Sequence, residues 1–313
     1  MSKGGAVAGL TERAGDRLFR YGVLGAGLAV VGLAAALAWE LASGSRLAWS
    51  EFGPAFLWSS SWNPVSERFG ALPFLYGTLV SSALALAIAG PLGVGSAIFL
   101  AELAPRRISD ACCFFIEILA AVPSVVLGLM GIFILVPGVR AVSPFLIEHL
   151  GFLPFFRGTP YGVGMLTAGL ILSIMILPYI TSISREVLLS VPRPLKEAAL
   201  ALGATRWETV RLVSLPYARS GILGAVFLAL GRALGETMAV TMVIGNSPRI
   251  SASLFDPAYT MAAVLANELA EATSDLHLHA LMAIAGTLFM LTLGMNALAR
   301  WMILGTPTAR RRP

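Results

Sequence analysis

The chain has 313 residues, of which 57% are hydrophobic and 12% are charged, and its formal net charge is +5. Soluble globular domains carry about 25% charged residues, so the composition excludes an ordinary soluble protein and indicates a membrane protein. The basic residues cluster at the ends of apolar segments, so the positive charge reflects membrane topology and does not indicate nucleic-acid binding.

Five apolar segments contain no Asp, Glu, Lys or Arg, and each is long enough for a membrane-spanning helix, which needs about 20 residues. They are residues 21–39, 69–101, 118–139, 161–183 and 276–299. A sixth segment, residues 220–248, is interrupted only by Arg232 and Glu236. The sequence therefore predicts an all-α polytopic membrane protein with six transmembrane helices.

The first apolar segment has two interpretations, a retained membrane anchor or a cleaved signal peptide. Its leader is about 20 residues long and contains both Glu12 and Asp16, which favours the anchor. We therefore expect a cytoplasmic amino-terminal segment at 1–20, one transmembrane domain at 21–304 with its core at about 69–304, and a basic cytoplasmic tail at 305–313. No loop is long enough for a separate soluble domain.

The distribution of basic residues predicts the orientation. If both termini lie on one side of the membrane, sixteen of the 22 Lys and Arg residues fall on that side and five on the other. The positive-inside rule then places both termini in the cytoplasm.

Cys112, Cys113 and Glu117 lie near the start of the third predicted span. Adjacent cysteines rarely form an ordinary disulfide, so we expect both to be packing residues. Glu117 has two interpretations: a structural acid that pairs or reaches the headgroup region, or a residue of a transport pathway.

Three histidines, His149, His277 and His279, were considered as metal ligands. His277 and His279 are two residues apart on an expected helix, so they point to different faces, and no acidic or cysteine partner has suitable spacing. We expect interfacial residues and no metal site.

The loop at 184–220 is the most informative polar segment. Pro194 suits the first turn of a helix, which we expect at about 195–202, and Gly203 suits its end. Thr205 and Glu208 have the spacing of a capping box that starts a second helix. Ala198, Ala199 and Ala201 form a small-residue face beside Glu197. Such a hairpin either joins two spans or presents a surface to a partner, and the residues alone leave both open.

Glu197, Ala198 and Ala199, followed by Gly203 and by the run Val213 to Pro216, resemble the EAA signature of ABC-importer permeases. That signature has isoleucine where this chain has Val213. The resemblance implies a type I ABC-importer permease (MetI-like) fold with a peripheral first helix and a core of five. It also implies that the loop is a coupling helix for a cytoplasmic ATPase, through Glu197, Ala198, Ala199, Gly203, Ala204, Thr205 and Arg206.

The sequence contains no GxxxxGK[ST] motif, so the chain cannot build its own P-loop. We therefore expect a transport subunit without enzymatic activity and without a cofactor of its own. ATP and Mg²⁺ would be bound by the partner ATPase.

Arg232 and Glu236 interrupt the sixth apolar segment. A charge at the centre of a membrane helix costs about 3 kcal/mol, and residues four apart on one helix share a face and can pair. One interpretation is a salt bridge that locks this helix against a neighbouring subunit. The other is an anion site, in which Arg232 attracts the substrate and Glu236 holds the guanidinium when the substrate is absent. The two residues alone leave both open.

The stretch "GRALGETMAVTMVIGN" and the segments at 62–102, 117–131, 215–240 and 260–272 resemble permeases of phosphate-specific ABC importers, of the PstC type. The similarity runs from about residue 60 to 300. It implies phosphate import across a bacterial inner membrane, with a second permease of the PstA type, an ATPase dimer and an extracytoplasmic phosphate-binding protein. Arg232 and Glu236 match pathway residues of that family, and Thr237 and Thr241 are expected hydroxyl donors along it.

Related sulfate and molybdate permeases also carry a Gly-Glu pair and a downstream Gly-Asn, like Gly235–Glu236 and Gly245–Asn246 here. Another oxyanion is therefore the alternative substrate. From other classes, an ion-coupled secondary transporter or channel and a non-transporting scaffold were considered, but neither explains the EAA hairpin.

Overall fold

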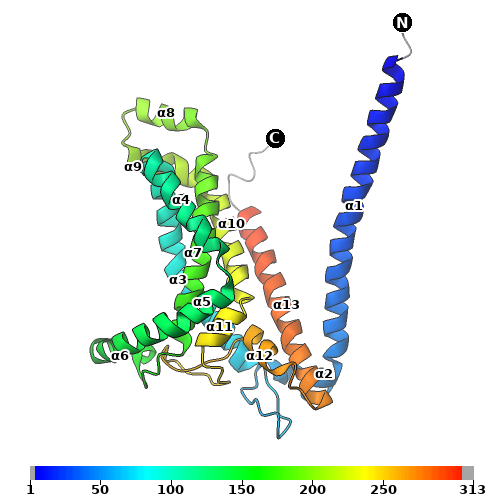
Figure 1. Ribbon diagram of the computed structural model, residues 1–313, viewed down its shortest axis with the longest axis vertical. Helices are drawn as coiled ribbons and strands as arrows, with labels where there is room; N and C mark the ends of the chain where they lie inside the picture. The colour runs from blue at the N-terminus through cyan, green and yellow to red at the C-terminus, as the bar shows by residue number, and fades with distance from the viewer. Residues whose placement is uncertain (1–3, 305–313) are drawn as a thin grey trace.

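The computed structural model describes residues 4–304, which form helices almost throughout (Figure 1). Within that range, extended segments pair only at the isolated bridge between Asn63 and Arg68. The elements, with η for short 3-10 or π-helical segments, are α1 (Gly4–Gly44), α2 (Arg46–Phe52), η1 (Gly53–Leu57), α3 (Leu72–Ile98), η2 (Phe99–Leu103), α4 (Arg106–Ala121), α5 (Ser124–Met130), η3 (Gly131–Leu135), α6 (Val136–Leu150), η4 (Pro154–Phe156), α7 (Met165–Leu189), α8 (Arg193–Ala201), α9 (Arg206–Thr209), η5 (Val210–Ser214), α10 (Leu215–Leu234), α11 (Met238–Val243), α12 (Met261–Glu268) and α13 (Asp275–Leu304).

Six continuous helical stretches are long and apolar enough to cross a membrane, which confirms the predicted number of spans. They are Phe19–Gly44, Leu72–Leu103, Ser124–Leu150, Met165–Leu189, Arg206–Leu234 and Asp275–Ile303. Helix α1 contacts α13 and α2 and stands apart from the bundle of α3, α7 and α10, in the peripheral place expected for it (Figure 1). The expected basic tail at 305–313 lies outside the described residues.

The predicted third span, residues 118–139, has the wrong boundaries. Helix α4 ends at Ala121, and Val122 and Pro123 adopt extended backbone before α5 begins. Pro123 explains the interruption, because its ring disfavours helical backbone at the residue before it. Cys112, Cys113 and Glu117 therefore belong to α4, and the apolar helix that follows it, Ser124–Leu150, turns away from the bundle (Figure 1).

The predicted fifth span, residues 220–248, has the wrong boundaries. Its apolar helix runs from Arg206 to Leu234. The start agrees with the second helix expected from the Thr205–Glu208 capping box. The end was placed too late, because Gly235 stops the helix inside an apolar stretch.

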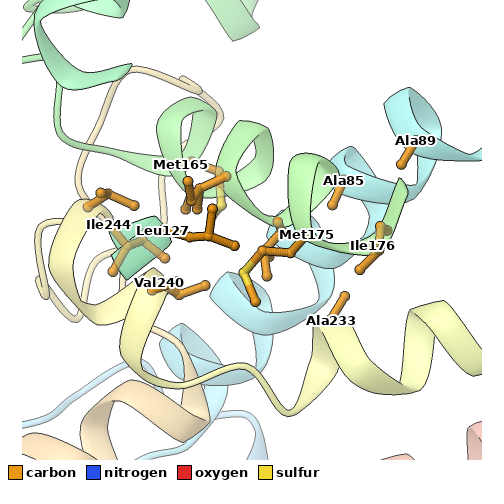
Figure 2. Packing of buried hydrophobic residues seen from close by; sticks show 14 of the residues in the cluster. Ala85, Ala89, Leu127, Met165, Met175, Ile176, Ala233, Val240 and Ile244 are labelled. Carbon is orange, nitrogen blue, oxygen red and sulfur yellow. The ribbon is translucent and has the colours of Figure 1, made fainter. Parts of the chain in front are cut away.

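The core forms where α3 and α7 pack along their lengths and α10, α5 and α11 close over them. Figure 2 shows the small side chains of Ala85 and Ala89 facing Ile176, with Met175 directed toward the segment that carries Val240. Small residues let membrane helices approach closely, because lipid supplies no hydrophobic force between them. A Cβ on Gly93 would lie 2.8 Å from Ile180, which shows how close α3 and α7 are.

A second cluster caps the opposite end of the molecule from α8, beneath the loop that precedes α3. Trp62 and Phe69 pack edge to face with ring centroids 4.9 Å apart, and Trp62 donates a hydrogen bond of 2.9 Å to Glu268 of α12. Tyr259 belongs to the same cluster. Burial raises the pKa of its hydroxyl to about 12, so the phenol stays neutral, and its oxygen accepts a hydrogen bond from Asn267. The cap fixes the start of α3 against α12.

We predict that Gly77→Ala destabilises the fold, because the added Cβ would lie 2.1 Å from the carbonyl oxygen of Tyr259 and the backbone would have to move. The expected loss is about 1–3 kcal/mol, seen as a lower thermal unfolding midpoint in detergent. Gly95→Ala is the matched control on the same helix, since nothing lies within 4 Å of its Cβ position. Equal midpoints for the two variants would contradict the packing described here.

Candidate functional site

Arg232 and Glu236, the two charges of the sixth apolar segment, lie at a break between α10 and α11. Gly235 follows the last residue of α10, and the next helix begins only at Met238. The Glu236 amide still donates to the Ala233 carbonyl, at 3.3 Å, but the following residues leave the α10 axis. Arg232 and Glu236 therefore do not share one helix face, and the predicted i,i+4 arrangement is wrong.

Glu236 has a local structural partner. Its carboxylate accepts a hydrogen bond of 3.3 Å from the Ala239 amide, one of the amides at the start of α11 that no helical carbonyl satisfies. Acidic side chains stabilise helix starts in this way. Glu236 thus fixes the geometry of the break, and among the described ion pairs none joins it to Arg232.

Arg232 instead lies over an aromatic ring from another helix. Its guanidinium carbon is 4.6 Å from the ring centroid of Tyr179 on α7. A cation–π contact of this kind stabilises the charge by about 0.5–2 kcal/mol without neutralising it with an anion. The side chain is exposed at the open flank of the bundle, so the positive charge remains accessible.

The depth of this charge follows from helix geometry. Arg219 is the last charged residue before Arg232, and thirteen residues at 1.5 Å each correspond to about 20 Å along α10. The hydrocarbon core of a bilayer is about 30 Å thick, so Arg232 lies at membrane depth if Arg219 lies near the interface.

Thr237 and Thr241 use their hydroxyl protons locally. Thr237 Oγ1 donates to the Gly235 carbonyl at 3.3 Å, and Thr241 Oγ1 donates to the Thr237 carbonyl at 2.7 Å. Their expected role as donors along a pathway therefore requires these hydrogen bonds to open. In the present arrangement both hydroxyls help to satisfy backbone carbonyls of the broken segment.

The break rests on a rigid base. Its buried neighbours on both sides belong to the core cluster of α3, α5, α7, α10 and α11: Ala233, Ala239, Val240, Val243 and Ile244. Figure 2 shows Ala233, Val240 and Ile244 turned into this cluster. Arg232, which is exposed, and Glu236, which is partly exposed, are thus positioned by buried neighbours that pack in the core.

The loop between α7 and α10 has the predicted hairpin structure. Helix α8 spans Arg193–Ala201, Gly203 adopts φ +89°, and Thr205 and Glu208 form the reciprocal capping box at the start of α9. Figure 1 shows α8 projecting from the end of the bundle at which α1 begins and α13 ends. Glu197, Ala198, Thr205 and Arg206 are exposed, and Ala199 and Ala204 are partly exposed.

This hairpin also exposes large apolar side chains. Leu200 is 46% exposed, Leu202 89% and Trp207 56%. Exposed apolar patches of this kind mark protein interaction sites.

Glu117 and the histidines, the remaining candidate residues, lie outside the break between α10 and α11. Glu117 is exposed on α4, one turn before Ala120, whose carbonyl is 3.5 Å from the Tyr179 hydroxyl. His277 is buried against Phe69 and lies 3.2 Å from Glu268. His149 contacts the Phe145 carbonyl. Among the side chains that the structure describes, no group of three or more His, Cys, Asp or Glu residues could hold a metal ion.

Sequence reasoning missed Tyr179 and the ion pair between Lys196 and Glu102. Both contacts join residues that are distant in the chain. For Tyr179, the one signal in the sequence is a tyrosine that follows Pro178 within an apolar run. The second has no sequence signal, since Glu102 reads as the polar end of a span.

Comparison with known proteins identifies the family of the chain. A phosphate transport system permease protein PstC of Mesorhizobium japonicum is 49% identical over 294 residues, which cover 92% of this chain and 90% of that protein. The proteins of the same name from Xylella fastidiosa (strain Temecula1) and Haemophilus influenzae are 46% and 45% identical, over 88% and 92% of this chain and 86% and 93% of theirs.

A solved structure described as inward-facing conformations of the MetNI methionine ABC transporter contains a chain that superposes with a TM-score of 0.52. The match covers 75% of this chain and 96% of that chain, and at 18% sequence identity it shows the fold alone. Residues 91–302 match the family described as binding-protein-dependent transport system inner membrane component, and the six apolar helices agree with a multi-pass inner membrane protein. The chain belongs to the family of binding-protein-dependent transport system inner membrane components, with a type I ABC-importer permease fold.

Proposed function

We propose that this chain is a permease subunit of an ATP-driven importer of inorganic phosphate and that Arg232 lies on the substrate pathway. The observation that carries the proposal is an exposed arginine in an apolar segment, with no carboxylate partner among the described residues, beside a helix break. The relatives of 45–49% identity over about nine-tenths of the chain carry phosphate transport in their names.

The chemistry of Arg232 suits a tetrahedral oxyanion. A guanidinium presents a planar fork of N–H donors that bind phosphate oxygens in pairs, and it stays charged at every physiological pH. Because the resting partner is an aromatic ring, an arriving anion does not have to displace a carboxylate. Glu236 acts in this proposal by fixing the break, not by holding the guanidinium.

The helix break next to Arg232 also supports a pathway at this position. Non-helical backbone at membrane depth is tolerated where it is buried in protein or lines a water-filled cavity. The inner face of the break is buried, and its charged face is open. We propose that a second permease, of the PstA type, closes this face and that the pathway runs between the two subunits.

The exposed hairpin supports the partner assignment. We propose that α8 and the turn around Gly203 dock on a cytoplasmic ATPase dimer, which binds ATP and Mg²⁺, while a phosphate-binding protein docks outside. Closure of the ATPase dimer moves the hairpin, and the spans alternate between outward and inward access. The hairpin, the start of α1 and the end of α13 lie at one end of the molecule, which supports cytoplasmic termini (Figure 1).

We predict that Arg232→Gln lowers ATP-dependent phosphate uptake at least about tenfold, because the pathway loses its positive charge. Uptake is measured in proteoliposomes that hold the complete transporter. Arg140→Gln is the matched control, an exposed arginine in the apolar helix α6, and it should transport at the rate of the unmodified chain. A full rate for Arg232→Gln would remove this residue from the pathway.

Tyr179 gives a finer test of the same site. We predict that Tyr179→Leu raises the phosphate concentration for half-maximal uptake about fivefold, because the guanidinium loses a contact of about 1 kcal/mol that holds its position. Tyr179→Phe keeps the ring face and should differ little from the unmodified chain. Equal effects of the two substitutions would show that the ring face is not what positions Arg232.

Gly203 tests the hairpin. We predict that Gly203→Val weakens co-purification of the ATPase subunits, because a β-branched residue at φ +89° costs about 1–2 kcal/mol and distorts the turn. Gly203→Asn is the control, since asparagine tolerates left-handed backbone. Retention of the ATPase by both variants at the same level would argue against docking through this turn.

A further inference from the structure

An ion pair joins the α8 hairpin to the end of α3. Lys196 Nζ lies 2.7 Å from Glu102 Oε1, and the same ammonium group is 3.4 Å from the Leu188 carbonyl at the end of α7. The two side chains are 18% and 10% exposed. The two Arg–carboxylate pairs in the described part of the chain, Arg106–Asp110 and Arg185–Glu186, each have a carboxylate that is mostly exposed.

Because this ion pair is mostly buried, it resists separation of its two charges. An exposed ion pair contributes little to stability and tolerates movement, because water solvates each charge when they separate. Charges withdrawn from water lose much of their solvation, so separating them inside the protein is costly. Lys196 and Glu102 therefore hold their two elements together more firmly than an exposed pair would.

The elements that this pair joins are not otherwise packed closely. Helix α8 packs against α9 and η5, the segments that lead into α10. The chain connects α8 to α7 through Pro192, but it does not connect α8 to α3. Lys196 provides that connection, since Glu102 lies in η2, the π-helical end of α3.

A second set of contacts holds η2. Ser109 Oγ of α4 donates to the Leu100 carbonyl at 2.9 Å and accepts from Arg185 Nη2 of α7 at 3.3 Å. π-helical segments inside longer helices are frequent at functional positions. The end of α3 is thus held by α4 and α7 and by the α8 hairpin.

We propose that the Lys196–Glu102 ion pair transmits movement of the α8 hairpin to α3, so that both are positioning residues for the coupling of ATP hydrolysis to transport. The inference rests on the proposed function. Helix α3 packs along α7, and α7 carries Tyr179 against Arg232. Movement of α8 therefore reaches the site along two routes, directly through η5 and α10, and through Glu102, α3 and α7.

The test measures phosphate taken up and ATP hydrolysed in the same proteoliposomes, with the complete transporter and the loaded binding protein. Lys196→Met and Glu102→Gln each remove one charge. We expect each to lower the phosphate transported per ATP hydrolysed about fivefold, while the ATPase subunits remain bound. Asp110→Asn is the matched control, because it removes an exposed ion pair of the neighbouring helix α4 and should leave the ratio unchanged.

Charge reversal separates transmission from general damage to the fold. The double variant Glu102→Lys with Lys196→Glu restores an attractive pair and should recover most of the lost ratio, and Lys196→Arg should keep it. Single variants that transport with the normal ratio, or a double variant no better than either single one, would overturn the proposal. ATP-independent uptake by the unmodified complex would instead overturn the proposed function, so the two failures are distinguishable.

Discussion

In a lipid bilayer every backbone amide and carbonyl must find a partner within the protein, and this requirement determines where the chain is able to stop being a helix. At the break after Gly235, the Glu236 carboxylate accepts from the Ala239 amide, and the Thr237 and Thr241 hydroxyls donate to backbone carbonyls. Because these groups are occupied with the backbone, Arg232 is the charged group at the break that remains available. The site depends on this difference between Arg232 and the groups that bond to the backbone.

The same constraint relates the site to the hairpin. Helices α9 and α10 with η5 form one continuous stretch from Arg206 to Leu234, so the exposed hairpin and the break lie at the two ends of one helix. A rigid helix carries displacement along its axis with little loss. The close α3–α7 contact at small residues provides a second rigid unit, which carries Tyr179. The relation between these two units determines how Arg232 sits on its aromatic partner.

The sequence predicted what depends on local chemistry. The number of spans, the α8 hairpin, the left-handed Gly203 and the Thr205–Glu208 capping box all follow from residues close together in the chain, and all are confirmed. The boundaries of the third and fifth spans were wrong because counting charges ignores proline and glycine breaks. The expectation that Arg232 and Glu236 share one helix face was wrong for the same reason, because Gly235 ends the helix between them. The contacts of Tyr179 with Arg232 and of Lys196 with Glu102 join distant segments, and no local pattern encodes them.

The central claim is that a phosphate permease subunit is driven by ATP that a partner hydrolyses. The direct measurement is uptake of labelled phosphate into proteoliposomes that contain the complete transporter, with the loaded binding protein outside and ATP or a non-hydrolysable analogue inside. We expect uptake with ATP alone, unaffected by collapse of the proton and sodium gradients. Uptake that persists with the analogue and disappears when an ion gradient is collapsed would contradict it.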